Sequence, residues 1–441
     1  MVAAHEPVEV REALLNRMVR AREETDQLFA LVRKDALYDR PIAERHRILF
    51  YIGHLEAFDW NLLCPCLPGL APFDASLDRL FAFGIDPVDG GLPADQPYDW
   101  PSIAAVRAYQ QRVRRILDAK LGETAFSDWG GGEAPFTLLN TAIEHRLMHA
   151  ETLAYMLHQL PLDRKHREPQ AVAPASSPVE ARQVEIPAGH VILGLPRAAT
   201  SRFGWDNEYE AHAVSVPSFR IDCYKVTNGQ FLEFLEAGGY DNRSLWNPES
   251  WDWKERQDIQ HPRFWRPNGE AWLYRTMFDE IPLPMNWPAY TSHAEASAYA
   301  RWAGGRLPTE GEWQRAAYGS RDEGDRGYPW GESAPQPCHG FFNFLRWDPI
   351  PVNSVPASRS DFGVEGLLAN GWEWTSSVFE PFTGFRPFSF YPGYSADFFD
   401  GRHFVMKGGS PRTAACMLRR EFRNWFQPYY PYVYAGFRCV C

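Results

Sequence analysis

Two histidines, His145 and His149, lie four residues apart in the segment HRLMHAE, a spacing that suits metal binding. On an α-helix their side chains project about 40° apart, so both imidazoles can bind one ion. The third ligand must come from another helix, and His54 in FYIGHLEAF has the best apolar helical setting for it. Three neutral imidazoles on one face of an octahedral ion leave positions open, which suits iron(II) with O2 as co-substrate.

Other interpretations of this spacing stay open at this point. With 13 histidines in 441 residues, a pair four residues apart can arise by chance. Such histidines then serve as hydrogen-bonded core or surface residues. Zinc is the competing metal ion, because it also accepts three imidazoles.

The elements that would position these histidines follow from hydrophobic periodicity. Apolar residues recur at three- and four-residue spacing over 10–32, 46–63, 101–121 and 136–160. We therefore expect a four-helix bundle over 1–163, with a long connection between its second and third helices. A Pro/Ala/Ser-rich linker should cover 164–183. The remainder, 184–441, has short apolar stretches between turn residues and is expected to be an α+β domain with helices over 292–305 and 309–319.

Composition narrows the functional class. The formal net charge is -11, and no run of Lys and Arg resembles a nucleic-acid patch, so nucleic acid is not an expected partner. Neither a signal peptide nor a long apolar span is visible, which predicts a cytoplasmic protein without a membrane partner. The seven cysteines do not form a disulfide framework. Two Cys-x-Cys pairs (Cys64 with Cys66, Cys439 with Cys441) could bind metal, but ordinary thiols are favoured.

Longer motifs carry a family resemblance. From residue 184 onward, VEIPAGHVILG, PMNWPAYTSHAEASAYARWAGGRLPTEGEWQRAA, DFGVEGLLANGWEWT and AGFRCV resemble the formylglycine-generating-enzyme-like domain, which is related to C-type lectins. The N-terminal part resembles a DinB-type four-helix domain, with HRLMHAE matching its H-x-x-x-H-x-E signature and His54 its earlier histidine. This pair of domains resembles the iron-dependent ergothioneine, ovothiol and selenoneine synthases. The resemblance implies iron(II) at the three histidines and a substrate pocket in the C-terminal domain.

The resemblance also implies roles for individual residues. FYPGYSADFF matches the family segment with active-site tyrosines, which makes Tyr391 the candidate catalytic proton donor and Tyr394 a substrate contact. The segment REFRNWFQPYYPYVYAGFR matches the one whose Asn-Trp pair contacts hercynine, the trimethylated histidine, so Asn424 and Trp425 are candidate substrate-binding residues. A quaternary ammonium is well held by aromatic faces.

Departures from the family pattern bear on the second substrate. Phe426 stands where ergothioneine synthases that use γ-glutamylcysteine have Asp, and Tyr430-Pro431 replaces their Arg-Arg pair. A dipeptide with two carboxylates needs cationic partners, whereas an uncharged sugar accepts aromatic stacking. Met148 replaces a glutamine that precedes the second helix histidine in many of these enzymes, so it is a further candidate substrate contact.

These departures favour the selenoneine synthase branch, in which iron(II) and O2 couple C2 of the hercynine imidazole to the selenium of a selenosugar. The nearest alternative is an ergothioneine synthase that forms a carbon–sulfur bond from hercynine and cysteine or γ-glutamylcysteine. Ovothiol-type chemistry on histidine and a non-catalytic ligand-binding module are further alternatives. Formylglycine generation would need a cysteine pair such as Cys416 and Cys439, and Cys439 lies in a strand-like segment that favours a structural thiol.

Overall fold

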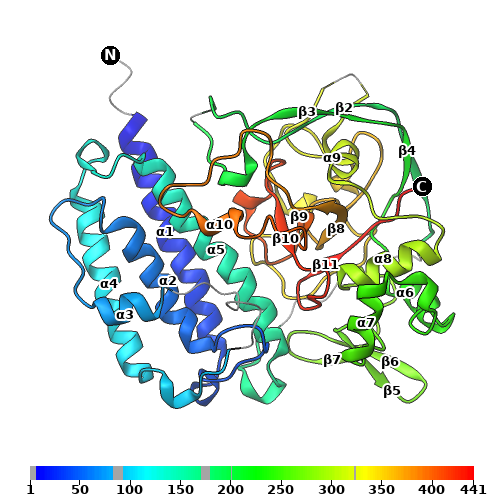
Figure 1. Cartoon of the computed structure of the whole chain (residues 1–441), viewed down its shortest axis with the longest axis horizontal. Coiled ribbons are helices and arrows are strands. Elements are labelled where there is room, and N and C mark those ends of the chain that lie inside the picture. Colours follow the sequence, from blue (N-terminus) through cyan, green and yellow to red (C-terminus); the bar gives the residue numbers. More distant parts are fainter. Residues whose placement is uncertain (1–5, 83–92, 170–178, 200, 322–323) are drawn as a thin grey trace. The chain divides into compact units, whose positions relative to one another are not determined.

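The computed structural model describes residues 6–82, 93–169, 179–199, 201–321 and 324–441. The chain divides into two compact units, residues 1–168 and 169–441. The first unit is helical and the second combines strands and helices, as Figure 1 shows. This confirms the expected fold class. Part of the predicted linker, residues 170–178, lies outside the described residues.

The N-terminal unit is a bundle of long helices. Helix α1 packs along α5, and α2 packs along α4. A short helix, α3, and an irregular connection separate α2 from α4. The helices of this unit are α1 (Glu6–Leu31), α2 (Ile48–Leu63), α3 (Ala75–Leu80), α4 (Ile103–Glu123) and α5 (Pro135–Gln159).

Local sequence explains where three of these helices start. Asp74 caps α3 by accepting a hydrogen bond from the Leu77 amide, and Ser102 caps α4 by accepting one from Ala105. Proline occupies the first position of α5, where no helical hydrogen bond is lost. Helices α2 and α5 are buried on almost every side, so both lie at the centre of the unit.

The C-terminal unit contains several small sheets rather than one large one. The largest has strand order β10-β9-β8-β11, with β11 parallel to β8 and the other pairs antiparallel. The remaining sheets are β1-β4, β2-β3 and β5-β6-β7. The strands are β1 (Gln183–Ile186), β2 (Gly189–Leu193), β3 (His212–Val216), β4 (Phe219–Asp222), β5 (Trp265–Asn268), β6 (Ala271–Arg275), β7 (Glu280–Pro282), β8 (Gly371–Val378), β9 (Phe404–Gly409), β10 (Asn424–Phe426) and β11 (Ala435–Gly436).

Helices of this unit pack against the sheets. Helix α9 lies against β2, β3, β8 and β9, and its Trp313 is part of the buried core that includes Ile186 and Val364. Thr309 and Glu312 form a capping box at its start. The helices are α6 (Asn228–Glu236), α7 (Pro248–Arg256), α8 (His293–Trp302), α9 (Glu310–Tyr318) and α10 (Gly393–Ala396).

The helices expected over 292–305 and 309–319 are confirmed as α8 and α9, whereas α3, α6, α7 and α10 were not predicted. In the described part of the chain, no helix is long and apolar enough to span a bilayer.

Candidate metal centre and substrate-binding residues

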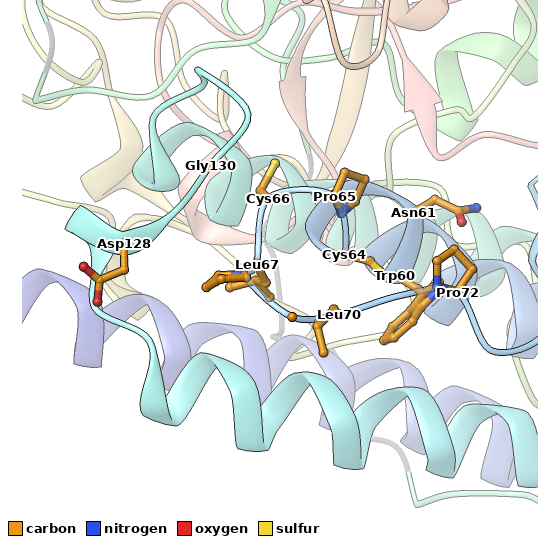
Figure 2. Close-up of a pocket in the computed structure, with 12 residues that line it drawn as sticks. Trp60, Asn61, Cys64, Pro65, Cys66, Leu67, Leu70, Pro72, Asp128 and Gly130 are labelled. Atoms are coloured by element: carbon orange, nitrogen blue, oxygen red, sulfur yellow. The ribbon is translucent and has the colours of Figure 1, made fainter.

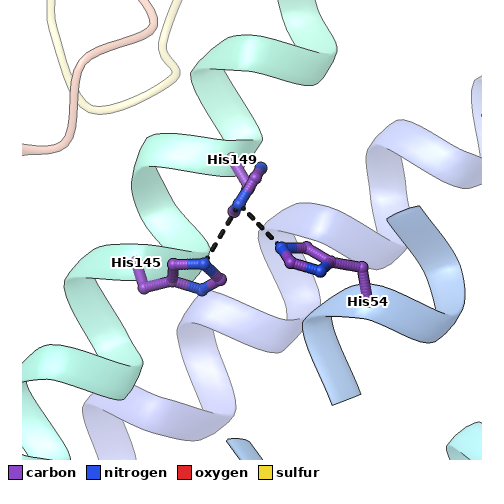
Figure 3. Close-up of side chains that lie close together, drawn as sticks. All are labelled: His54, His145 and His149. Carbon is purple, nitrogen blue, oxygen red and sulfur yellow. Dashed lines mark hydrogen bonds between the residues drawn. The ribbon is translucent and has the colours of Figure 1, made fainter. Parts of the chain in front are cut away.

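The three predicted ligands converge in the N-terminal unit. One ring nitrogen of each histidine lies within 4.8 Å of the corresponding nitrogens of the other two, and all three residues are buried. Nε2 of His149 lies 3.1 Å from Nε2 of His145 and 3.2 Å from Nε2 of His54. Figure 3 shows His145 and His149 projecting from one helix toward His54 on another. The structure therefore brings together side chains that lie up to 95 residues apart.

A backbone carbonyl orients His54. Its Nδ1 lies 2.7 Å from the carbonyl oxygen of Phe81, which directly follows α3. Since a carbonyl only accepts, Nδ1 must carry the proton, and Nε2 then presents a lone pair to the centre. Gly53 permits this contact, because a Cβ at that position would lie 2.5 Å from ring carbons of Phe81.

Burial keeps the histidines neutral. It lowers the pKa of His54 to about 4, although the hydrogen bond to Phe81 acts in the opposite direction. Burial also lowers the pKa of His145 and His149 well below the usual value, and the neighbouring histidines add to the effect. The Phe58 ring stacks on His145 with centroids 3.4 Å apart, and Phe50 stacks on His54 at 4.9 Å. The centre is thus a water-poor site with uncharged nitrogen donors.

The donor set fits a divalent transition-metal ion. Converging Nε2 atoms of neutral imidazoles cannot all be satisfied by one another, because each contact needs one protonated nitrogen. An ion would satisfy all the lone pairs at once. Imidazole suits iron, zinc, copper and nickel, and a three-histidine set leaves coordination positions for substrate and O2. Among the described residues, this is the only group of three or more His, Cys, Asp or Glu side chains with such convergence.

The Cys-Pro-Cys segment lines a separate hollow. It has a volume of about 520 Å³ and lies beside the C-terminal end of α2. Its lining includes Trp60, Cys64 and Cys66, and Figure 2 shows the two cysteine side chains pointing in different directions. Burial raises the pKa of both thiols. Protonated thiols that do not converge support the interpretation as ordinary thiols.

In the C-terminal unit, three of the predicted site residues, Tyr391, Tyr394 and Trp425, belong to one aromatic cluster. Tyr394 lies between Tyr391 and Trp425, with ring centroids 5.5 and 5.4 Å away, and it stacks on Trp205 at 3.9 Å. Phe379 stacks on Trp425 at 4.2 Å, nearly parallel. We refer to these five residues, Trp205, Phe379, Tyr391, Tyr394 and Trp425, as the Trp425 cluster.

Asn424 and Phe426 flank Trp425 in β10, so strand alternation directs their side chains to the opposite face. Phe426 stacks on Tyr430 at 5.2 Å, and Tyr430 meets Tyr432 edge-on at 5.0 Å. The Arg263 guanidinium lies 5.1 Å over the Tyr432 ring. An aromatic surface therefore exists here, but a cation adjoins it.

Tyr429 does not join this surface, because it stacks on Trp253 of α7. Met148 is half-buried on α5 and directly precedes His149. It belongs to a different unit from the Trp425 cluster.

Sequence reasoning missed the groups that surround the histidines. Nothing in the sequence indicates that the Phe81 carbonyl accepts a hydrogen bond from His54. Arg146, Glu56 and Asp59 form buried ion pairs between α5 and α2. A signal was available for Glu56 and Asp59, which are charged residues inside the largely apolar segment 48–63, whereas Arg146 lies among other polar residues.

Comparison with known proteins gives the context of this geometry. Residues 169–441 match the model of the sulfatase-modifying factor enzyme 1-like domain, and residues 17–153 match the DinB superfamily. The hercynine oxygenase of Mycobacterium tuberculosis is 40% identical over 254 residues, which cover 56% of this chain and 58% of that protein. The hercynine oxygenase of Mycolicibacterium thermoresistibile is 36% identical, with 67% of each chain covered.

Ergothioneine biosynthesis protein 1 of Neurospora crassa is 28% identical over 92% of this chain and 55% of its own length. The chain thus spans only about three fifths of the Mycobacterium tuberculosis relative and about half of the fungal one.

Proposed function

The chain belongs to the two-domain family in which a DinB domain precedes a sulfatase-modifying factor enzyme 1-like domain and which includes hercynine oxygenases, and we propose that it is itself an iron(II)- and O2-dependent hercynine oxygenase. The observation that carries this proposal is the convergence of three buried, neutral imidazoles in the DinB part. His54, His145 and His149 would hold the iron. When bound, iron(II) would supply the redox chemistry by which O2 reacts with the two substrates.

The reaction balances with O2 as the only oxidant. The imidazole C2–H and the thiol S–H are lost and a C2–S bond forms, which releases two electrons and two protons. Sulfur gives up two more electrons as it takes one oxygen atom and becomes a sulfoxide. The second oxygen atom leaves as water, so all four electrons are accepted by one O2. A selenol donor would give the corresponding selenoxide.

The Trp425 cluster supports a site for the trimethylammonium group of hercynine. Aromatic faces attract a quaternary ammonium through their quadrupoles, and desolvation strengthens the attraction. Trp425 and Tyr394 supply such rings close together. Tyr391 at the edge of the cluster is proposed as the proton donor. Asn424 adjoins Trp425 in β10, but its side chain is directed to the opposite face, so we do not assign it to this ammonium site.

For the second substrate we propose a sulfur donor, cysteine or γ-glutamylcysteine. The relatives are named for hercynine oxygenation and ergothioneine biosynthesis. Arg263 beside Tyr432 also provides a positive charge near residues 424–434, which include no arginine. A carboxylate-bearing thiol could use such a cation.

A selenosugar is the second candidate donor. The Phe426, Tyr430 and Tyr432 rings form a continuous aromatic surface, and sugars bind such surfaces through their apolar faces. Phe426 and Tyr430 also replace the charged residues expected of a γ-glutamylcysteine enzyme.

The test is a competition between donors. Iron-loaded protein would be mixed in air with hercynine and equal concentrations of cysteine, γ-glutamylcysteine and a selenosugar, and the products identified by mass spectrometry. A sulfoxide of a hercynine thioether supports the sulfur proposal. A selenium adduct formed in preference overturns the sulfur donor and supports the second candidate. Failure to consume hercynine with any donor overturns the function itself.

A further inference from the structure

A buried ionic cluster links the two helices that carry the metal ligands. Arg146 on α5 donates through Nη1 to Glu56 at 3.1 Å and through Nη2 to Asp59 at 2.6 Å, and both carboxylates are on α2. All three side chains are at most 1% exposed. We refer to these residues as the Arg146 cluster.

The cluster lies next to the ligands in the chain. Arg146 directly follows His145, and its Nη2 also donates to the backbone carbonyl of Leu55, which directly follows His54. The guanidinium of Arg146 therefore connects the position directly after His145 to Leu55, the position directly after His54. A planar guanidinium with several fixed donors can hold these acceptors at once, which a single ammonium cannot do.

The other helices of the bundle brace the cluster. Arg114 on α4 donates to Glu56 at 2.8 Å and also forms a two-pronged pair with Asp26 on α1, at 2.6 and 2.9 Å. Thr25 on α1 lies 3.5 Å from Nη1 of Arg146. Glu56 is thereby held from two sides, so its position on α2 is set by contacts from α4 as well as α5.

Burying these charges is not an efficient way to gain stability. Removing two ions from water costs several kcal/mol each, and well-packed apolar side chains often stabilise as much. What an ionic cluster adds is directional contacts that have one correct register, whereas apolar helix faces tolerate sliding and rotation. A slip of one residue along α2 would move His54 by about 1.5 Å along the helix axis.

We propose that Arg146, Glu56 and Asp59 are positioning residues of the metal centre. Their cluster sets the register and rotation of α2 against α5, and so places Nε2 of His54 opposite the pair on α5 before any ion binds. This inference rests on the proposed role of the three histidines as metal ligands, but it is independent of which substrate is used. Residues that orient metal ligands typically contribute 10- to 100-fold to metal affinity.

The test uses cobalt(II), whose visible absorption reports coordination geometry, and needs no substrate. Arg146→Lys keeps the positive charge but should lose simultaneous contact with Glu56, Asp59 and Leu55. We expect 10- to 100-fold weaker cobalt(II) binding and a changed spectrum. Glu56→Gln keeps the shape of the side chain and should give a smaller loss in the same direction.

Arg438→Lys is the matched control. Arg438 is fully buried and pairs with Glu373 in the C-terminal unit, so the substitution also removes a buried guanidinium, but one that does not contact the Arg146 cluster. We expect the midpoint of thermal unfolding to fall in this variant while cobalt(II) affinity and spectrum stay as in the wild type. Circular dichroism would verify that each variant is folded. If Arg146→Lys is unfolded, the cobalt(II) affinity and spectrum of Glu56→Gln alone test the positioning role.

Two failures can be told apart. If wild-type protein binds cobalt(II) no better than a His145→Ala variant, the metal centre and the proposed function fall together. If wild-type binding depends on His145 but Arg146→Lys and Glu56→Gln keep both affinity and spectrum, only the positioning role is overturned.

Discussion

Nδ1 of His54 lies 2.7 Å from the carbonyl oxygen of Phe81, a residue 27 positions further along the chain. This contact determines which nitrogen of His54 is available to a metal ion, because the donating nitrogen keeps its proton. It also ties the ligand on α2 to the segment after α3. A connection between helices therefore takes part in the metal centre.

Removal of the ligands should abolish metal binding. We expect His54→Ala, His145→Ala and His149→Ala each to lose most of the bound iron(II), since two imidazoles hold an ion far less well than three. The measurement is iron per chain after anaerobic loading and desalting. His166→Ala, at an exposed position of the same unit, is the control and should load like the wild type. Full loading of any ligand variant would contradict the assignment.

Metal binding should also stabilise the folded protein. An ion that binds only the native state at about 100 times its Kd adds about 2.7 kcal/mol to the free energy of unfolding. Thermal unfolding with and without iron(II) measures this, and the midpoint should rise in the wild type but not in His145→Ala. An equal rise in both proteins would place the ion elsewhere.

Gly53→Ala should disturb the orientation of His54. The added Cβ would lie 2.5 Å from the Phe81 ring, so Phe81 must move and its carbonyl moves with it. Overpacking of this kind costs about 1–3 kcal/mol of stability, and we expect weaker metal binding as well.

Gly122→Ala in α4 is the matched control, because nothing lies within 4 Å of its added Cβ. It should be neutral or stabilise by up to about 1 kcal/mol, with metal affinity unchanged. Equal effects of the two substitutions on metal affinity would refute the role of the Phe81 contact.

His293 should make stability fall in acid. Burial lowers its pKa to about 3, and the hydrogen bond to the Thr375 carbonyl opposes this only in part. The unfolded chain takes up a proton below about pH 6.5 while folded His293 stays neutral. Its contribution is therefore complete above pH 6.5 and is lost as the pH falls toward 3.

The measurement is the free energy of urea unfolding of metal-free protein between pH 7 and 5. From pH 7 to 5 the wild type should lose about 2 kcal/mol more than His293→Gln, whose amide can still donate to the Thr375 carbonyl. The metal ligands titrate alike in both proteins, so the difference isolates His293. Parallel curves would show that this residue does not contribute.

Trp425→Leu should weaken hercynine binding. Loss of an aromatic face from a desolvated ammonium site costs about 1–2 kcal/mol, which corresponds to a roughly 10-fold higher Kd. Isothermal titration with hercynine measures it. Trp302→Leu removes a tryptophan of α8 that is 37% exposed and should leave the Kd unchanged. If Trp425→Leu binds hercynine with the wild-type Kd, the Trp425 cluster is not part of the hercynine site.

Tyr391→Phe should slow turnover without loss of binding. A positioned proton donor contributes about 10²- to 10⁴-fold to rate, so kcat should fall by at least about 100-fold while hercynine Kd stays near the wild type. Tyr98→Phe, at a residue 83% exposed, is the control. Unchanged kcat in Tyr391→Phe would mean that another group supplies the proton.

Much of the fold follows from local pattern. Periodicity identified the four long helices of the bundle, because a long amphipathic or apolar helix shows itself over several turns, but it did not identify the short helix α3. Helices α6 and α7 were missed although Thr227 with Gln230 and Asn247 with Pro248 mark their starts. Each covers only nine residues, so periodicity is weak and capping chemistry is the better signal.

The pairing of His145 with His149 was determined by sequence alone, since helix geometry fixes where residues four positions apart point. The convergence of His54 on that pair, the proton on its Nδ1 and the Arg146 cluster were decided by tertiary structure. These contacts join residues 27 to 95 positions apart, and no local rule specifies them. The same holds for Trp425 and Phe426, adjacent in sequence but sent to opposite faces once residues 424–426 pair as a strand with β9.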